Sequence, residues 1–274
     1  MMVHFDPSDG TLLQEAFLRD EVRYNLLHLI LSGEDSLRIR SDDGQLIFGK
    51  TPGQYNAWLW VSGDVGEKRR MALIGELAEE VSGLEIPGVT GDIGIAEEFA
   101  RRYGEPRNLA AQPFVELISY ACTELKRPQG VAGQPVPVGM EDRERVARYL
   151  ADFDFDAFGR RNPPELHLGA AESYIRQGDL LFWKVDGEPV SMARIVHRSD
   201  RYARIAYVYT PPEYRGRGYA GALTSELSET VLREGRIPML YADAANPVSN
   251  RLYRNLGYKE SGSVTDLAFV HRPV

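Results

Sequence analysis

The strongest short-range folding signal in the chain is the dipeptide Asp186-Gly187. It separates two runs rich in β-branched and aromatic residues, LLFWKV at 180–185 and PVSMARIVH at 189–197. An Asp-Gly pair between such runs is typical of a tight β-hairpin, because both turn positions need a positive φ. A third run, YARIAYVYT at 202–210, follows a polar turn. This half of the chain therefore predicts three successive antiparallel strands.

Helices are predicted on both sides of this three-strand meander. Before it, residues 140–153 have the spacing of an amphipathic helix, and residues 163–178 predict a second helix that starts at its prolines and ends at a glycine. After it come a helix from Tyr219 to about Gly235, a strand at 237–242, a short helix at 249–256 and a final pair of strands within 258–272. The predicted fold class is α/β (α+β), with a mixed, mostly antiparallel sheet flanked by helices.

The first half has a weaker pattern. One helix is predicted from Ser8 or Asp9 to Gly33, followed by a hairpin around Asp43-Gly44, a strand at 55–61 and two helices at 67–83 and 95–104. PFVELISYACTEL at 113–125 fits a strand or a helix equally well. KRPQGVAGQPVPVG at 126–139 has the composition of a linker. We therefore predict two domains, residues 1–130 and 131–274, of which the first is a smaller α/β domain.

Composition narrows the classes of function. With 274 residues, 43% of them hydrophobic, the chain can bury a sizeable core. The net charge of −8 argues against sequence-independent binding of nucleic acid or of an anionic membrane. The single cysteine, Cys122, excludes an internal disulfide and a multi-thiolate metal site, and it fits a reducing compartment. We expect a cytoplasmic protein without a metal, as a monomer or homodimer, with no nucleic-acid or membrane partner.

GQLIFGKT at 44–51 matches the P-loop expression G-x-x-x-x-G-K-[ST] without a mismatch. A phosphate-binding loop must follow a strand and open a helix, so that backbone N–H groups converge on the phosphates. Here the interior of the loop resembles a strand, and Pro52-Gly53 and another strand follow it. We therefore expect no nucleotide site at this position.

YRGRGYAG at 214–221 fits two signatures. Gly216, Gly218 and Gly221 match the dinucleotide fingerprint G-x-G-x-x-G, and Asp243 follows roughly 20 residues later, as an NAD(P)-dependent oxidoreductase would require. Three features oppose this interpretation. PPEYR at 211–215 separates the strand from the glycines, the preceding strands form an antiparallel meander, and too few residues remain for a doubly wound sheet.

The same stretch also matches R-x-x-G-x-A, and its consecutive N–H groups can cradle a pyrophosphate at a helix N-terminus. An asparagine-tyrosine segment follows at 246–258. Together the two segments resemble the signature of the GNAT superfamily of acyl-CoA N-acyltransferases, in its two-domain form with a degenerate N-terminal GNAT-like half. The matching residues are Arg215, Gly218 and Ala220 in the first segment, and Asn246, Asn250, Tyr253, Gly257 and Tyr258 in the second.

The resemblance implies an N-acetyltransferase that moves an acetyl group from acetyl-CoA to a primary amine by direct attack in a ternary complex. The acceptor would be a small molecule or a protein. A main-chain N–H near Tyr209 would stabilise the oxyanion, and Tyr253 would be the catalytic acid. The residues implied to bind coenzyme A are Val208, Tyr209, Thr210, Arg215, Gly216, Arg217, Gly218, Tyr219, Ala220, Gly221, Asn246 and Asn250.

One departure from the family pattern concerns the general base. Many members keep a glutamate on a central strand, but residues 204–210 contain no carboxylate, and Tyr241 stands where some relatives keep it. Asp243 is the nearest acidic residue, and it equally fits the end of a strand, so the base is left unassigned. The missing carboxylate leaves an alternative open, a non-catalytic regulatory module that binds coenzyme A.

Overall fold

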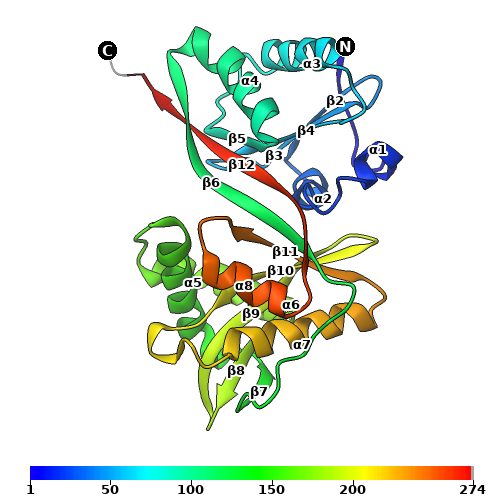
Figure 1. Cartoon of the computed structure of the whole chain (residues 1–274). Helices are drawn as coiled ribbons and strands as arrows, with labels where there is room; N and C mark the ends of the chain where they lie inside the picture. Colours follow the sequence, from blue (N-terminus) through cyan, green and yellow to red (C-terminus); the bar gives the residue numbers. More distant parts are fainter. Residues whose placement is uncertain (273–274) are drawn as a thin grey trace. The chain divides into compact units, whose positions relative to one another are not determined.

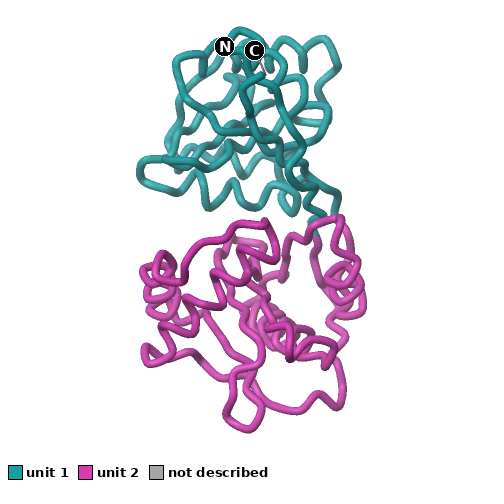
Figure 2. The backbone as a smooth tube through the Cα atoms, turned by 90° about the vertical axis from the view of Figure 1, so that its left-hand side faces the viewer, with its two compact units in different colours: residues 1–119, 261–274 teal, residues 120–260 magenta. Residues whose placement is uncertain are grey.

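The computed structural model describes residues 1–272, which form two compact units. Unit 1 comprises residues 1–119 together with the chain from Ser261 onward, and unit 2 comprises residues 120–260 (Figure 2). Each unit contains a mostly antiparallel sheet flanked by helices (Figure 1). The predicted fold class is therefore confirmed.

Unit 1 has a sheet in the strand order β1-β2-β3-β4-β5-β12, antiparallel except for β4 and β5, which are parallel. Its elements are β1 (Met2–His4), η1 (Thr11–Leu13), α1 (Glu15–Leu18), α2 (Leu26–Ser32), β2 (Leu37–Ser41), β3 (Leu46–Lys50), β4 (Ala57–Val61), α3 (Glu67–Glu80), β5 (Gly88–Gly91), α4 (Ile93–Gly104), η2 (Glu105–Arg107) and most of β6 (Leu109–Ala121) and β12 (Lys259–His271).

The two faces of the sheet of unit 1 are covered by different helices. Leu77 of α3 and Phe99 of α4 pack with Phe48 of β3 in one apolar core. On β3 the next residue is Gly49, where an added Cβ would lie 2.9 Å from Leu31 of α2. Since successive residues of a strand point to opposite faces, α2 lies against the face opposite α3 and α4.

Unit 2 has a sheet in the strand order β7-β8-β9-β10-β11, in which only β10 and β11 are parallel. Asp186 (φ 48°) and Gly187 (φ 83°) form the predicted hairpin turn. Its elements are β7 (Gln134–Pro137), η3 (Met140–Asp142), α5 (Arg143–Phe158), η4 (Pro164–His167), α6 (Leu168–Gln177), β8 (Leu180–Val185), β9 (Glu188–Arg198), β10 (Tyr202–Tyr209), η5 (Pro212–Tyr214), α7 (Tyr219–Arg233), β11 (Ile237–Asp243) and α8 (Pro247–Asn255).

Two apolar cores place the helices of unit 2. Leu223 and Leu227 of α7 pack on Ile205 of β10 on one face of the sheet. Leu150 of α5 and Ala171 of α6 pack with residues of β8 and β9 on the other face. The sheet therefore separates α7 from α5 and α6.

The order of elements in unit 1 recurs in unit 2. Each unit has a strand, two helices, a three-strand antiparallel meander, a helix, a strand parallel to the last one, and a further helix (Figure 1). The strands that follow are exchanged. β12 follows α8 but pairs with β5, with Leu267 opposite Val89, while β6 follows α4 and ends in unit 2, where the N–H of Cys122 donates to the carbonyl of Pro238. The repeated order supports two halves of related fold.

Several expectations are corrected here. The helix predicted from Ser8 to Gly33 is broken into η1, α1 and α2, and the intervening Asp20 accepts a hydrogen bond from the indole of Trp60. The final pair of strands is the single strand β12, and the ambiguous stretch at 113–125 lies largely in β6. The units divide at 119/120 and 260/261 instead of once at 130/131, because β12 completes the sheet of unit 1, and the proposed linker contains β7.

Candidate functional site

The parallel strands β10 and β11 of unit 2 separate soon after they begin. They pair only from Tyr202 with Ile237 to Arg204 with Met239, although β10 continues to Tyr209 and β11 to Asp243. Beyond that point the backbone groups that face the gap have no partner strand. The separation therefore exposes main-chain donors and acceptors in the interior of the sheet.

A β-bulge lies in β10 at the level of this separation. Ala206 faces Arg194 and Tyr209 faces Met192, so three steps along β10 match two along β9. Tyr207 within the bulge has a φ of 55°, which is unfavourable for a bulky side chain. A bulge re-aims the backbone that follows it, here at Val208 and Tyr209. Strain kept at such a position is typical of functional sites.

The loop after β10 turns into α7 through two glycines with left-handed backbone. Gly216 has a φ of 77° and Gly218, the residue before the helix, a φ of 84°. The first helical bond runs from the N–H of Ala222 to the carbonyl of Gly218. None of the six N–H groups at 216–221 donates to another residue between 1 and 272. Six consecutive free donors at the N-terminus of a 15-residue helix make a site for an anion such as pyrophosphate.

The two arginines of this loop are engaged by their own unit. Arg215 forms an ion pair with Asp156 of α5, and its Nε donates to the carbonyl of Thr210 at 2.9 Å. Arg217 is exposed, and it donates to the carbonyl of Glu213. Arg215 therefore holds the loop to α5, and backbone N–H groups are the free donors of the loop.

The two asparagines at α8 have different surroundings. Asn246 is exposed and caps the helix, because its side chain accepts from the N–H of Ser249. Asn250 is buried, and its Nδ2 donates to the carbonyls of Asp243 and Asn246 at 2.9 and 2.8 Å. These bonds make Asn250 a residue that shapes the turn after β11. Its direct contact with coenzyme A stays a prediction.

Tyr253 of α8 has a buried ring, 6.1 Å from the ring of Tyr120. Its hydroxyl has no hydrogen-bond partner within residues 1–272 and is not sealed from solvent. Burial raises the pKa of this phenol above its ordinary range. The hydroxyl therefore stays protonated at neutral pH, and no neighbouring group in residues 1–272 accepts from it.

Asp243 does not take the position of a free general base. Its Oδ1 accepts from the N–H of Ala245 at 2.8 Å, and its carbonyl accepts from Asn250. The carboxylate thus supports the turn at the end of β11, as a residue ending a strand commonly does. The general base stays unassigned.

The corresponding positions of unit 1 lack these features. β5 is paired with β4 up to its last residue, Gly91, so the strands do not separate. The connection to α3 has only five residues, and it contains Asp64, which is ion-paired with Arg19. Glu67 then begins the helix. Two carboxylates at a helix start would repel a pyrophosphate, which gives a physical basis for a degenerate half.

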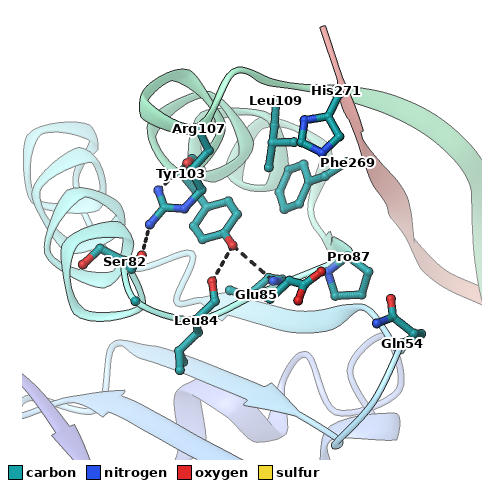
Figure 3. Close-up of a pocket in the computed structure, with 12 residues that line it drawn as sticks. Gln54, Ser82, Leu84, Glu85, Pro87, Tyr103, Arg107, Leu109, Phe269 and His271 are labelled. Atoms are coloured by element: carbon teal, nitrogen blue, oxygen red, sulfur yellow. Dashed lines mark hydrogen bonds between the residues drawn. The ribbon is translucent and has the colours of Figure 1, made fainter.

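A pocket of about 490 Å³ lies in unit 1, and its lining includes Tyr103, Arg107, Glu85 and His271 (Figure 3). The hydroxyl of Tyr103 donates to the carbonyl of Leu84 and accepts from the N–H of Ile86. Arg107 donates to the carbonyls of Tyr103 and Ser82. Because Tyr103 and Arg107 are engaged with neighbouring backbone, and the free N–H groups and the separating strands lie in unit 2, we place the candidate site in unit 2.

Two alternative interpretations of sequence motifs find no support in the structure. Residues 46–50 of the P-loop match form β3 in an antiparallel sheet, and no helix follows them. The glycines of the dinucleotide match come after η5 and an antiparallel meander, not directly after the first strand of a parallel unit.

Within residues 1–272, no cluster of histidine, cysteine or acidic side chains fits a metal ion. None of the helices described there has the length and apolar character of a membrane span.

Comparison with known proteins relates the second half of the chain to one family. The family described as FR47-like protein matches residues 184–265, which include the glycine loop and the asparagine-tyrosine segment. A curated relative, mycothiol acetyltransferase of Acidothermus cellulolyticus, is 28% identical over 197 residues, which cover 65% of this chain and 59% of that protein. These two matches support a GNAT superfamily protein.

Solved GNAT structures share the fold of the chain over nearly its whole length. An acetyltransferase of the GNAT family from Colwellia psychrerythraea has a TM-score of 0.61 at 11% identity and covers 98% of this chain and 100% of its own. A GCN5-related N-acetyltransferase from Sphaerobacter thermophilus has a TM-score of 0.60 at 20% identity, with 100% and 96% covered. The fold of the chain therefore recurs over nearly its whole length in solved structures.

Sequence reasoning missed several residues that shape the site. Nothing in the letters marked the positive φ of Tyr207 or the ion pair that joins Arg215 to Asp156. Tyr120 and its hydrogen bond to Asn250 were also missed, because the two residues are 130 positions apart. The sequence did contain a signal for Arg194 and Arg204. Arginines inside the apolar runs of β9 and β10 are unusual in a sheet covered on both faces.

Proposed function

We propose that unit 2 is an N-acetyltransferase that binds acetyl-CoA and acetylates a primary amine by direct attack in a ternary complex. The observation that carries the proposal is the row of six free N–H groups at 216–221, which suits a pyrophosphate, beside two strands that separate. Arg215, Gly216, Arg217, Gly218, Tyr219, Ala220 and Gly221 form this loop. Val208, Tyr209 and Thr210 would bind the pantetheine arm, with Asn246 and Asn250 on the opposite side of the gap.

Acetyl-CoA supplies an activated acyl group, and the side chains and backbone of unit 2 supply its surroundings. A main-chain N–H near Tyr209 stabilises negative charge on the carbonyl oxygen as the amine nitrogen forms its bond to carbon. Tyr253 donates its proton to the sulfur as the carbon–sulfur bond breaks. The amine loses a proton to solvent, since Asp243 is held in its turn.

Release of free thiol from acetyl-CoA in the presence of a panel of amines tests the proposal. Amine-dependent thiol release, with the acetylated amine confirmed by mass spectrometry, is the expected result. The second candidate is the non-catalytic coenzyme A-binding module, which the hydrogen bond from Ala245 to Oδ1 of Asp243 favours. It predicts binding of acetyl-CoA by calorimetry and no turnover with any amine. An oxidoreductase would instead be stabilised more by nicotinamide dinucleotides than by acetyl-CoA.

A further inference from the structure

Arg204 of β10 is a cation inside the sheet for which unit 2 offers no counter-ion. It lies between Ala203 and Ile205, which pack under α7, so its side chain projects to the face of α5 and α6. Its Nε is sealed from solvent without a hydrogen-bond partner. No carboxylate or carbonyl in residues 1–272 accepts from any of its N–H groups.

The surroundings of Arg204 are aromatic and cationic. Its guanidinium carbon lies 5.9 Å from the ring centroid of Tyr241 on β11. The hydroxyls of Tyr174 and Tyr207 hydrogen-bond to each other at 3.0 Å. Both tyrosines act to raise the pKa of Arg204, against the larger effect of burial. Burial lowers the pKa of the Arg204 guanidinium, and no carboxylate acts to raise it. The residue that faces it on β9 is His197, which brings no negative charge.

A second arginine on this face, Arg194, is buried and has the hydrogen-bond acceptors that the half-buried Arg204 lacks. Its guanidinium carbon lies 3.8 Å from the ring centroid of Tyr174, and its Nη2 donates to Oε1 of Gln177 at 2.6 Å. Arg204 acts to lower the pKa of Arg194, as a nearby like charge does. This face therefore carries two cations close together, of which only Arg194 has hydrogen-bond acceptors.

The position of Arg204 relates it to the candidate site. It belongs to the last paired position of β10 and β11, directly before the strands separate. Val208 lies four residues further along β10, just beyond Tyr207 in the bulge. An acceptor that enters the gap from the face of α5 and α6 would therefore have its amine near the bulge and its other end toward Arg204.

We propose that the acceptor is an amine with a carboxylate at its far end, and that Arg204 binds this carboxylate. The inference rests on the proposed acetyl transfer and deepens it. A guanidinium presents parallel N–H donors that match a carboxylate, and one open guanidinium matches one negative charge. The hydroxyls of Tyr174 and Tyr207 offer one further donor on the same face, because their mutual hydrogen bond uses the other O–H. Because Arg204 and the bulge are separate positions on β10, we expect ω-amino acids to be favoured over α-amino acids.

The test uses the full-length protein and pairs of acceptors that differ only in charge. Glycine, β-alanine, 4-aminobutyrate and 6-aminohexanoate are compared with their carboxamides in the thiol-release assay. The expected result is that kcat/KM favours the carboxylate of a pair by about tenfold to a hundredfold. Arg204→Gln should remove this preference while it leaves the affinity for acetyl-CoA unchanged, and Arg204→Lys should restore part of it. Arg201→Gln, at an exposed arginine three residues earlier, is the matched control and should keep the preference.

If Arg204→Gln does not fold, the wild-type protein provides the test. Hexanoate should then inhibit turnover of 6-aminohexanoate competitively and more strongly than hexanamide. Equal turnover of carboxylates and carboxamides in every pair, or a preference unchanged by Arg204→Gln, overturns the carboxylate site and leaves acetyl transfer standing. If no acceptor in the panel turns over, the carboxylate site is overturned as well, and the panel of simple amines decides separately on acetyl transfer.

Discussion

The hydroxyl of Tyr120 donates a hydrogen bond to Oδ1 of Asn250 across 3.0 Å, and both side chains are buried. Nδ2 of the same amide donates to the carbonyls of Asp243 and Asn246. One amide thus ties the end of β6 to the turn between β11 and α8. The asparagine of the family signature has its donors and its acceptor engaged before any ligand is considered.

Asn250→Ala should therefore lower stability more than Asn246→Ala. The first substitution removes three buried hydrogen bonds of the amide, to two carbonyls and from Tyr120, which we expect to cost about 1–3 kcal/mol of the free energy of unfolding. The second removes an exposed helix cap, worth about 1 kcal/mol or less. Urea unfolding of both variants is the measurement. Equal losses in the two variants would contradict the structural role of Asn250.

Gly218→Val should weaken binding of acetyl-CoA. Valine at a φ of 84° is strained, and its Cβ would lie 3.2 Å from Cγ2 of Val131, beside the free N–H groups of the loop. Gly235→Val is the matched control, because Gly235 follows the other end of the same helix with a φ of 76° and no atom near its Cβ. Both variants should melt at a lower temperature. Calorimetry should show loss of affinity for acetyl-CoA only at Gly218, and an unchanged affinity there would remove the loop from the site.

Local signals in the sequence predicted unit 2 closely. Asp186-Gly187 requires two left-handed residues and therefore fixes the hairpin, and Gly218 marks the start of α7. The exchange of β6 and β12 could not be predicted, because pairing between distant strands leaves no periodic pattern in either one. The same holds for Arg204, whose missing counter-ion becomes visible only once the neighbouring elements are in place.

The strand exchange predicts where unit 2 can be cut. A fragment of residues 134–260 keeps the glycine loop but lacks Tyr120 and Cys122, whose hydrogen bonds reach Asn250 and Pro238. A fragment of residues 120–260 keeps both bonds and should melt at a higher temperature, since the buried partners stay satisfied. Thermal unfolding followed by circular dichroism compares the two. Identical melting temperatures would show that β6 does not belong to the folding unit of the site.

The acid stability of unit 1 should depend on Asp43. Burial acts to raise the pKa of this carboxyl, but hydrogen bonds from Ser41, Arg69 and the N–H of Gln45 hold it at about 2, below its ordinary value of 3.8. A lowered pKa stabilises the folded state above pH 4 and loses this effect as the pH falls toward 2. Asp43→Asn should therefore lower the melting temperature at pH 7, with a difference from wild type that closes near pH 2. Asp42→Asn, whose Oδ1 lies 4.0 Å from Arg69, is the control and should change the melting temperature less.

Tyr253→Phe should separate chemistry from binding. The substitution keeps the buried ring, so the affinity for acetyl-CoA and the melting temperature should be nearly unchanged, while kcat falls by about 10²-fold through loss of the proton donor. Because burial raises the pKa of Tyr253, the wild-type rate should show no decline from this group up to about pH 10. Rates are measured with the chemical step shown to limit turnover.

Tyr258→Phe is the matched control for this prediction. The hydroxyl of Tyr258 shares a buried hydrogen bond of 2.7 Å with Ser228, so its loss should cost about 1 kcal/mol of stability and leave kcat unchanged. The two variants thus predict opposite patterns on the same aromatic cluster. Wild-type turnover by Tyr253→Phe, together with a lowered melting temperature, would make Tyr253 a packing residue. The proton for the leaving sulfur would then have to come from water.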